Sequence, residues 1–131
     1  MKIIKDSDVA EWADKYNFVD ENNVVVGYSS SQGCCENAAY FFADIEPTEA
    51  DSRDEADPAP SLLEPYRFDP DYFKELPDTA RNLDSGGCVA FRLLAPDKPP
   101  LYLVLFNSHN GYYSHGFTVK VNGQQTREGS L

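Results

Sequence analysis

The last third of the chain has the pattern of short β-strands joined by tight turns. From Gly87 onward, four strand-like runs (CVAFRLL, LYLVLFNSH, YYSHGFTVKV and QQTREGSL) are separated by APDKPP, by Asn110-Gly111 and by Asn122-Gly123. Asn-Gly between alternating apolar runs is the strongest short-range hairpin signal, because both central residues of a type I′ turn need a positive φ. The pattern therefore predicts an antiparallel meander of four strands.

The first Asn-Gly pair sorts the side chains around it onto two predicted faces. With Asn110 and Gly111 as the turn residues, His109 faces Tyr112, and alternation assigns the rest. One face is nearly all apolar and should pack on the core: Tyr102, Val104, Phe106, Tyr113, His115, Phe117 and Val119. The other face is mixed: Leu103, Leu105, Asn107, His109, Tyr112, Ser114 and Thr118. The two histidines of the chain then point to opposite faces, which disfavours a His–His metal site.

The N-terminal segment has the signals of a helix. Asp8 and Glu11 have the spacing of a capping box, and Ser7 is an equally good cap. The apolar residues that follow have the i, i+3, i+4, i+7 spacing of one buried helical face: Val9, Trp12, Ala13 and Tyr16. We therefore expect an N-terminal helix.

Two further segments are predicted as strands. The β-branched run over about 24–29 is bounded by Asn and Ser, which is typical of a strand. Residues 37–45 fit either a helix or a strand. We favour a strand, because aromatic residues crowd together there and a tight turn at Gly33 would pair it with 24–29.

An acidic, proline-containing loop is expected at about 46–65, and its length is typical of a functional or mobile loop. A short second helix should follow, with Asp69 as its cap, Pro70 at the first helical position, and apolar contacts from Tyr72, Phe73 and Leu76. Together these elements predict a single domain over residues 1–131 of the α+β class. It would combine an antiparallel sheet, its C-terminal four-strand meander, an N-terminal helix and the short second helix.

Charge and hydropathy restrict the partners and the location. The net charge is −11, with −9 on residues 44–84 and +2 on residues 85–131. No basic stripe exists that could displace counterions, so direct nucleic-acid binding is not expected. No apolar run approaches the ~18 residues of a membrane span, and the acidic start lacks the apolar region of a signal peptide. We therefore expect a cytoplasmic protein that does not bind membranes, with an unknown protein or small molecule as its partner and an undetermined oligomeric state.

Three cysteines, Cys34, Cys35 and Cys88, are predicted to be reduced thiols, since their number is odd and no secretion signal accompanies them. Zinc usually binds paired cysteines with two or more residues between them, and Cys34-Cys35 has no spacer. We expect neither a metal nor a cofactor. An alternative is a Cys–His hydrolase or transferase, in which Cys34 or Cys35 is the nucleophile and His109 its base.

Two motifs together resemble a small-protein family of bacteriophages and bacteria that has no assigned function. SSSQGCCENAAYFFADIE, residues 29–46, resembles its Cys-Cys-Glu segment, and FNSHNGYYSHGFTVKVNG, residues 106–123, resembles its Asn-Gly-Tyr-Tyr-Ser hairpin. The resemblance covers about 24–46 and 101–131. The matching positions are Cys34, Cys35, Glu36, Asn110, Gly111, Tyr112, Tyr113 and Ser114. His109 and His115 lie beside the motif rather than in it.

The resulting functional hypothesis is a non-enzymatic binding module, such as a phage or bacterial accessory protein. Its predicted binding residues are Glu36, His109, Asn110, Tyr112, Tyr113 and Ser114. Because the resemblance joins the two motifs, we expect the Cys-Cys-Glu segment to lie beside the hairpin. Two alternatives stay open: the Cys–His enzyme, and an antagonist of a host protein whose acidic loop mimics a nucleic acid.

Overall fold

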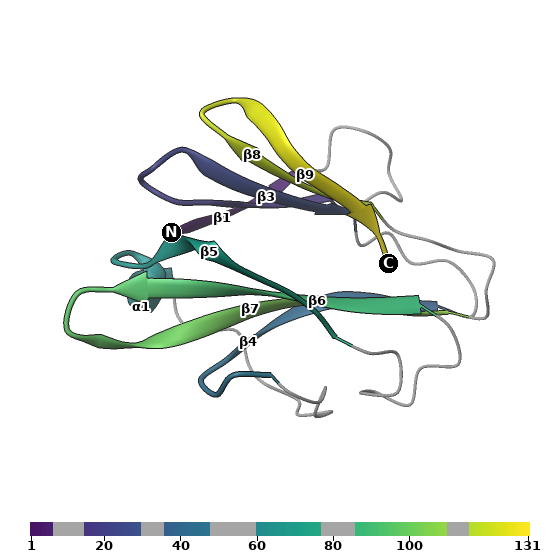
Figure 1. Cartoon of the computed structure of the whole chain (residues 1–131), viewed down its shortest axis with the longest axis horizontal. Helices are drawn as coiled ribbons and strands as arrows, with labels where there is room; N and C mark the ends of the chain where they lie inside the picture. Colours follow the sequence, from purple (N-terminus) through teal and green to yellow (C-terminus); the bar gives the residue numbers. More distant parts are fainter. Residues whose placement is uncertain (7–14, 30–35, 48–59, 77–85, 110–115) are drawn as a thin grey trace.

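The chain folds into two antiparallel β-sheets that form two layers, as the computed structural model shows (Figure 1). The structure describes residues 1–6, 15–29, 36–47, 60–76, 86–109 and 116–131. Sheet A has the strand order β1-β2-β3-β8-β9, and sheet B has the order β4-β7-β6-β5. In these ranges, no helix is long and apolar enough to cross a membrane.

Sheet A consists of β1 (Lys2–Asp6), β2 (Lys15–Val19), β3 (Val24–Ser29), β8 (Gly116–Val121) and β9 (Gln124–Ser130). Sheet B consists of β4 (Glu36–Ala43), β5 (Arg67–Leu76), β6 (Gly86–Ala95) and β7 (Lys98–His109). Among the described residues the only helix is the four-residue α1 (Pro60–Leu63), just before β5.

Apolar side chains fill two regions, one on each face of sheet B. The main core includes residues of both sheets, among them Phe18 and Val26 of sheet A and Leu103 and Leu105 of sheet B. A second cluster includes Val104 and its neighbours on the alternate positions of β4, β6 and β7: Phe41, Ala43, Cys88, Ala90, Tyr102 and Phe106. Strand β7 is thus buried on both faces, which explains why its sequence LYLVLF is continuously apolar.

The α+β prediction is wrong, because the described chain is nearly all strand. The segment predicted as the second helix is β5 instead. Its cap signal is real, since Asp69 Oδ1 accepts a hydrogen bond from the Asp71 amide at 2.9 Å. The chain then enters a β-bulge between Phe68 and Phe73 rather than a helical turn. Phe73 packs in the main core while Tyr72 packs on the second cluster, which is a two-residue period.

The N-terminal region also differs from its prediction. Residues 7–14 of the predicted helix lie outside the described ranges, but Tyr16 belongs to β2 and pairs with Tyr28 of β3. Strands β1 and β2 were not predicted. The preference for strand over helix at 37–45 is confirmed by β4. Its predicted partner is wrong, because β4 pairs with β7 and not with the 24–29 strand.

The predicted meander is interrupted in its middle. Strand β6 pairs with β7 and β8 pairs with β9, as expected. The Asn122-Gly123 turn is confirmed by positive φ values of 52° and 79°. However, β7 and β8 lie in different sheets, so the chain passes from sheet B to sheet A between them. The two faces predicted across 102–119 therefore belong to two separate sheets, and the Asn110-Gly111 turn itself lies outside the described residues.

Candidate functional site

The two ends of the sandwich differ in how their strands are connected. At one end, which we call the Glu36 end, the strands join through connections 7–14, 30–35, 77–85 and 110–115, each of six to nine residues. At the other, the Asp20 end, three of the connections are two to four residues long: 20–23, 96–97 and 122–123. The connection from β4 to β5, which contains α1, also begins and ends at the Asp20 end.

The Asp20 end is held by one buried carboxylate. Asp20 Oδ1 accepts hydrogen bonds from the amides of Asn22 at 3.0 Å and Val24 at 2.9 Å, which fixes the turn between β2 and β3. Its other oxygen, Oδ2, accepts one from the Phe68 amide of sheet B at 2.9 Å. A single side chain therefore fixes a turn of sheet A and attaches it to sheet B.

The Glu36 end brings together the two motifs singled out by the sequence. In the ladder between β4 and β7, Glu36 is the direct backbone partner of His109. Cys35 immediately precedes Glu36, and Asn110 immediately follows His109. Of the Cys-Cys-Glu segment the structure describes Glu36, which lies beside the strand that leads to Asn110. The predicted approach of the whole segment to the hairpin tip lies outside the described residues. The remaining predicted residues lie outside the described ranges: Cys34, Cys35, Asn110, Tyr112, Tyr113 and Ser114.

Two buried hydrogen bonds connect the sheets beneath the Glu36 end. The Tyr28 hydroxyl of β3 donates to the carbonyl oxygen of Phe106 in β7 at 2.6 Å. The Asn107 side-chain amide of β7 donates to the carbonyl oxygen of Leu131 at 3.1 Å. These bonds form where both partners are shielded from water, so they fix the relative position of the strand ends.

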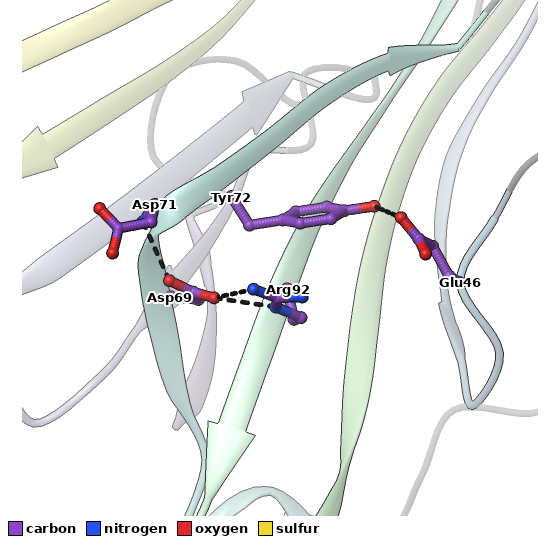
Figure 2. Close-up of polar contacts among 5 residues, drawn as sticks. All are labelled: Glu46, Asp69, Asp71, Tyr72 and Arg92. Atoms are coloured by element: carbon purple, nitrogen blue, oxygen red, sulfur yellow. Dashed lines mark hydrogen bonds and ion pairs between the residues drawn. The ribbon is translucent and has the colours of Figure 1, made fainter.

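A second polar cluster, not foreseen from the sequence, lies on the outer face of sheet B (Figure 2). Arg92 of β6 donates from Nε and Nη2 to Asp69 Oδ2 of β5, at 2.8 and 2.6 Å. The pKa of Asp69 lies below its ordinary value, mainly because the Asp71 amide donates to it; Arg92 lowers it further, and burial opposes both. The pKa of Arg92 is raised, mainly by its hydrogen bond to Asp69.

Tyr72 extends this cluster across the sheet. Its ring lies 4.8 Å from the Arg92 guanidinium carbon, and its hydroxyl donates to Glu46 Oε1 at 3.1 Å (Figure 2). Lys74 lies 3.9 Å from the same Glu46 oxygen. Burial, and then the hydrogen bond to the Glu46 carboxylate, raise the pKa of Tyr72 to about 12. The cluster thus fastens the chain after β4 to β5, at the opposite edge of the sheet.

Each carboxylate of this second cluster has a basic partner, and the cluster joins three segments of the chain. We therefore interpret it as structural and call it the clasp: Glu46, Asp69, Tyr72, Lys74 and Arg92. Asp69 is paired with Arg92, and Glu46 with Lys74. No group of three or more His, Cys, Asp or Glu in the described part of the chain is placed to hold a metal ion. Sequence reasoning missed the clasp because its residues come from three separate segments. The Asp69-Pro70-Asp71 signal marked its position but was assigned to a helix cap.

Comparison with known proteins adds no relative: no protein-family model, curated protein or solved structure matches this chain.

Proposed function

We propose that the protein is a non-enzymatic binding module and that it binds its partner at the Glu36 end. The observation that carries the proposal is the direct backbone pairing of Glu36 with His109. This pairing joins two segments that are far apart in the sequence. Each of them contains one of the two motifs on which the family resemblance rests. The proposed binding residues are Glu36, His109, Asn110, Tyr112, Tyr113 and Ser114.

The contrast between the two ends supports this location. Binding residues are disproportionately found on connections that a rigid scaffold holds in position. Here three short turns join strands at the Asp20 end, which also carries the long connection from β4 to β5, while four connections of six to nine residues begin and end at the Glu36 end. Tyrosine and histidine combine an apolar ring with a polar tip, which suits contacts that need packing and a hydrogen bond together.

The distribution of charge supports a partner other than a nucleic acid. The described ranges contain nine basic and twelve acidic residues, a net charge of −3, so −8 of the total of −11 lies in the segments between them. Half of this −8 lies on residues 7–14 and 77–85 at the Glu36 end, and the other half lies on residues 48–59, in the connection that belongs to the Asp20 end. No connection at the Glu36 end carries a net positive charge, so none would attract a phosphate backbone. We propose an unknown protein or small molecule as the partner and the cytoplasm as the location. An accessory role in a phage or bacterium rests on the family resemblance.

The test is affinity capture from the native host with matched variants of the protein. Glu36→Ala and Tyr112→Ala should each remove the partner that the wild-type protein captures, while thermal unfolding stays unchanged. Gln125→Ala, at an exposed position of β9, is the matched control and should keep the partner. Equal capture by the wild-type protein and all three variants would contradict the proposed site.

The Cys–His enzyme is a second candidate, since the pairing of Glu36 with His109 brings the stretch of backbone that follows Cys35 next to His109. Cys35 is the covalent neighbour of the residue that pairs with His109. If His109 activates this thiol, alkylation of Cys35 should be faster than that of an ordinary thiol at neutral pH. The His109→Ala variant should remove the difference. A rate that His109→Ala leaves unchanged would exclude this function and leave the binding proposal standing.

A further inference from the structure

The turn between β8 and β9 is built on an exposed Asn-Gly pair. Asn122 and Gly123 have φ values of 52° and 79°, and both are exposed. A Cβ atom built on Gly123 would meet no other atom within 4 Å. The Asn122 amide donates a hydrogen bond to the Asn23 carbonyl oxygen at 3.1 Å, which attaches this turn to the turn between β2 and β3.

We propose that Asn122 is a site of spontaneous deamidation and isoaspartate formation, and that this modification loosens β9 from the sandwich. The backbone nitrogen of Gly123 attacks the side-chain carbonyl carbon of Asn122. A new C–N bond forms, and the side-chain nitrogen leaves as ammonia with the proton lost by Gly123. Water then opens the cyclic imide at either carbonyl, which yields aspartate or isoaspartate. Water is the only co-reactant.

Glycine makes the attack possible because it has no side chain to shield its own nitrogen. The attack also needs the Asn122 backbone to leave its turn conformation, so it depends on local opening. Opening should be easy at this tip, since all seven residues of β9 are exposed and elements with few buried contacts open at low free energy. Two other asparagines offer a contrast: Asn107 is fully buried, and Asn22 is followed by Asn23 rather than glycine.

Isoaspartate would change the structure more than aspartate would. It adds a methylene group to the main chain, and a two-residue type I′ turn has no room for an added backbone atom. The neighbouring contact with Asn23 would be lost with the turn. Strand β9 also covers part of the core edge, because the Arg127 guanidinium carbon lies 3.8 Å from the Phe73 ring centroid of sheet B. A loosened β9 would therefore expose an aromatic side chain of the core.

The experiment is incubation of the full-length folded protein at mildly alkaline pH, with peptide mapping for isoaspartate and hydrogen exchange of the β9 amides. Isoaspartate should accumulate at position 122, and exchange in β9 should rise in proportion. Asn122→Gly cannot be modified and keeps a turn-compatible residue, so its β9 should stay protected. Asn122→Asp, measured before incubation, adds the charge without the methylene and should resemble the fresh wild-type protein.

Two results would overturn the proposal. One is the absence of isoaspartate at 122 in the folded protein over a period that converts the same position in urea. The other is modification without any rise in β9 exchange relative to Asn122→Gly. The Asn110-Gly111 pair provides an internal reference, and conversion confined to it would also contradict the assignment to Asn122.

Discussion

Tyr28 and Phe106 join the two sheets through a 2.6 Å hydrogen bond between a side-chain hydroxyl of β3 and a main-chain carbonyl of β7. Both residues are buried, and they lie 78 positions apart in the sequence. Because β7 carries His109 three residues further on, this bond also sets the position of the Glu36 end relative to sheet A. This hydrogen bond thus links the main core to the strand that carries the proposed binding surface.

Tyr28→Phe should remove this bond with little change in volume. A hydrogen bond contributes about 0.5–1.5 kcal/mol net, so we expect the free energy of unfolding in urea to fall by an amount in this range. Tyr66→Phe is the control, since its hydroxyl donates to the Pro99 carbonyl oxygen at 2.9 Å in a partly buried position. The free energy of unfolding should fall less in this control than in Tyr28→Phe. Equal losses in the two variants would show that the Tyr28 bond has no special role.

Asp20 should be among the most sensitive polar positions of the fold. Asp20→Ala leaves three amides, those of Asn22, Val24 and Phe68, without their acceptor. We expect a loss of about 3 kcal/mol, since each buried donor without a partner costs about 1–3 kcal/mol. Asp20→Asn keeps one acceptor oxygen for the turn and loses the bond to Phe68, so its loss should be intermediate. Denaturant unfolding of both variants orders these effects, and a smaller loss for Asp20→Ala than for Asp20→Asn would contradict the assignment.

Local sequence signals predicted the strands better than their partners. The Asn122-Gly123 turn formed as expected because β8 and β9 are neighbours in one sheet. Asn110-Gly111 carries the same signal, but β7 is already flanked by β4 and β6, so no edge is left for β8. A hairpin signal reports the propensity of a turn and not whether the flanking strands have free edges.

The same limit explains the helix predicted at Asp69. Its capping hydrogen bond is present, yet Phe73 and Tyr72 pack on opposite faces of sheet B. Burial on both sides of the sheet decided the conformation, and a single segment does not reveal that second apolar surface. For the site, the sequence predicted that the Cys-Cys-Glu segment lies beside the Asn110-Gly111 hairpin, and the described part of this prediction is the pairing of Glu36 with His109. The sequence could not reveal the clasp around Arg92, because its residues come from separate segments that meet only in the folded sheet.

Gly129 should tolerate no side chain, because the edge of Phe117 lies where its Cβ would be. An added Cβ would come within 2.5 Å of a Phe117 ring carbon. Phe117 is buried among Phe73 and Phe91 and has little room to move. We expect Gly129→Ala to cost about 1–3 kcal/mol, the usual range for overpacking. In Gly116→Ala the nearest atom lies at 3.8 Å, so thermal unfolding of this control should be nearly unchanged. Equal melting temperatures for the two variants would refute the steric argument.

Asp69 should titrate below its ordinary pKa, and its contribution to stability should depend on pH accordingly. A carboxyl group with a lowered folded-state pKa stabilises the fold above its unfolded pKa and loses that effect as the pH falls through the folded value. Arg92→Gln should raise the Asp69 pKa only in part, because the main cause, the Asp71 amide, is kept. Carboxyl titration by NMR measures both values. A full return to the ordinary pKa in Arg92→Gln would show that the amide bond has no effect.

The pKa of Tyr72 is raised, whereas that of Asp69 is lowered, so Tyr72 should affect stability at alkaline pH. Its pKa is raised to about 12 in the folded protein, compared with an ordinary value of 10.0. A group whose folded pKa is raised contributes stability that is fully present below the unfolded pKa and is lost as the pH rises through the folded value. We therefore expect part of the stability to disappear between about pH 10 and 12, and less of it to disappear in Tyr72→Phe.

Glu46→Gln separates the two causes of this shift. It keeps an acceptor for the Tyr72 hydroxyl but removes the negative charge, so the Tyr72 pKa should fall while staying above its ordinary value, since burial is the larger cause. Ultraviolet titration of the tyrosines, with Tyr72→Phe to identify the transition, measures this directly. An unchanged Tyr72 transition in Glu46→Gln would mean that Glu46 does not accept a hydrogen bond from the Tyr72 hydroxyl in solution. The chain after β4 would then lack its hydrogen bond to β5.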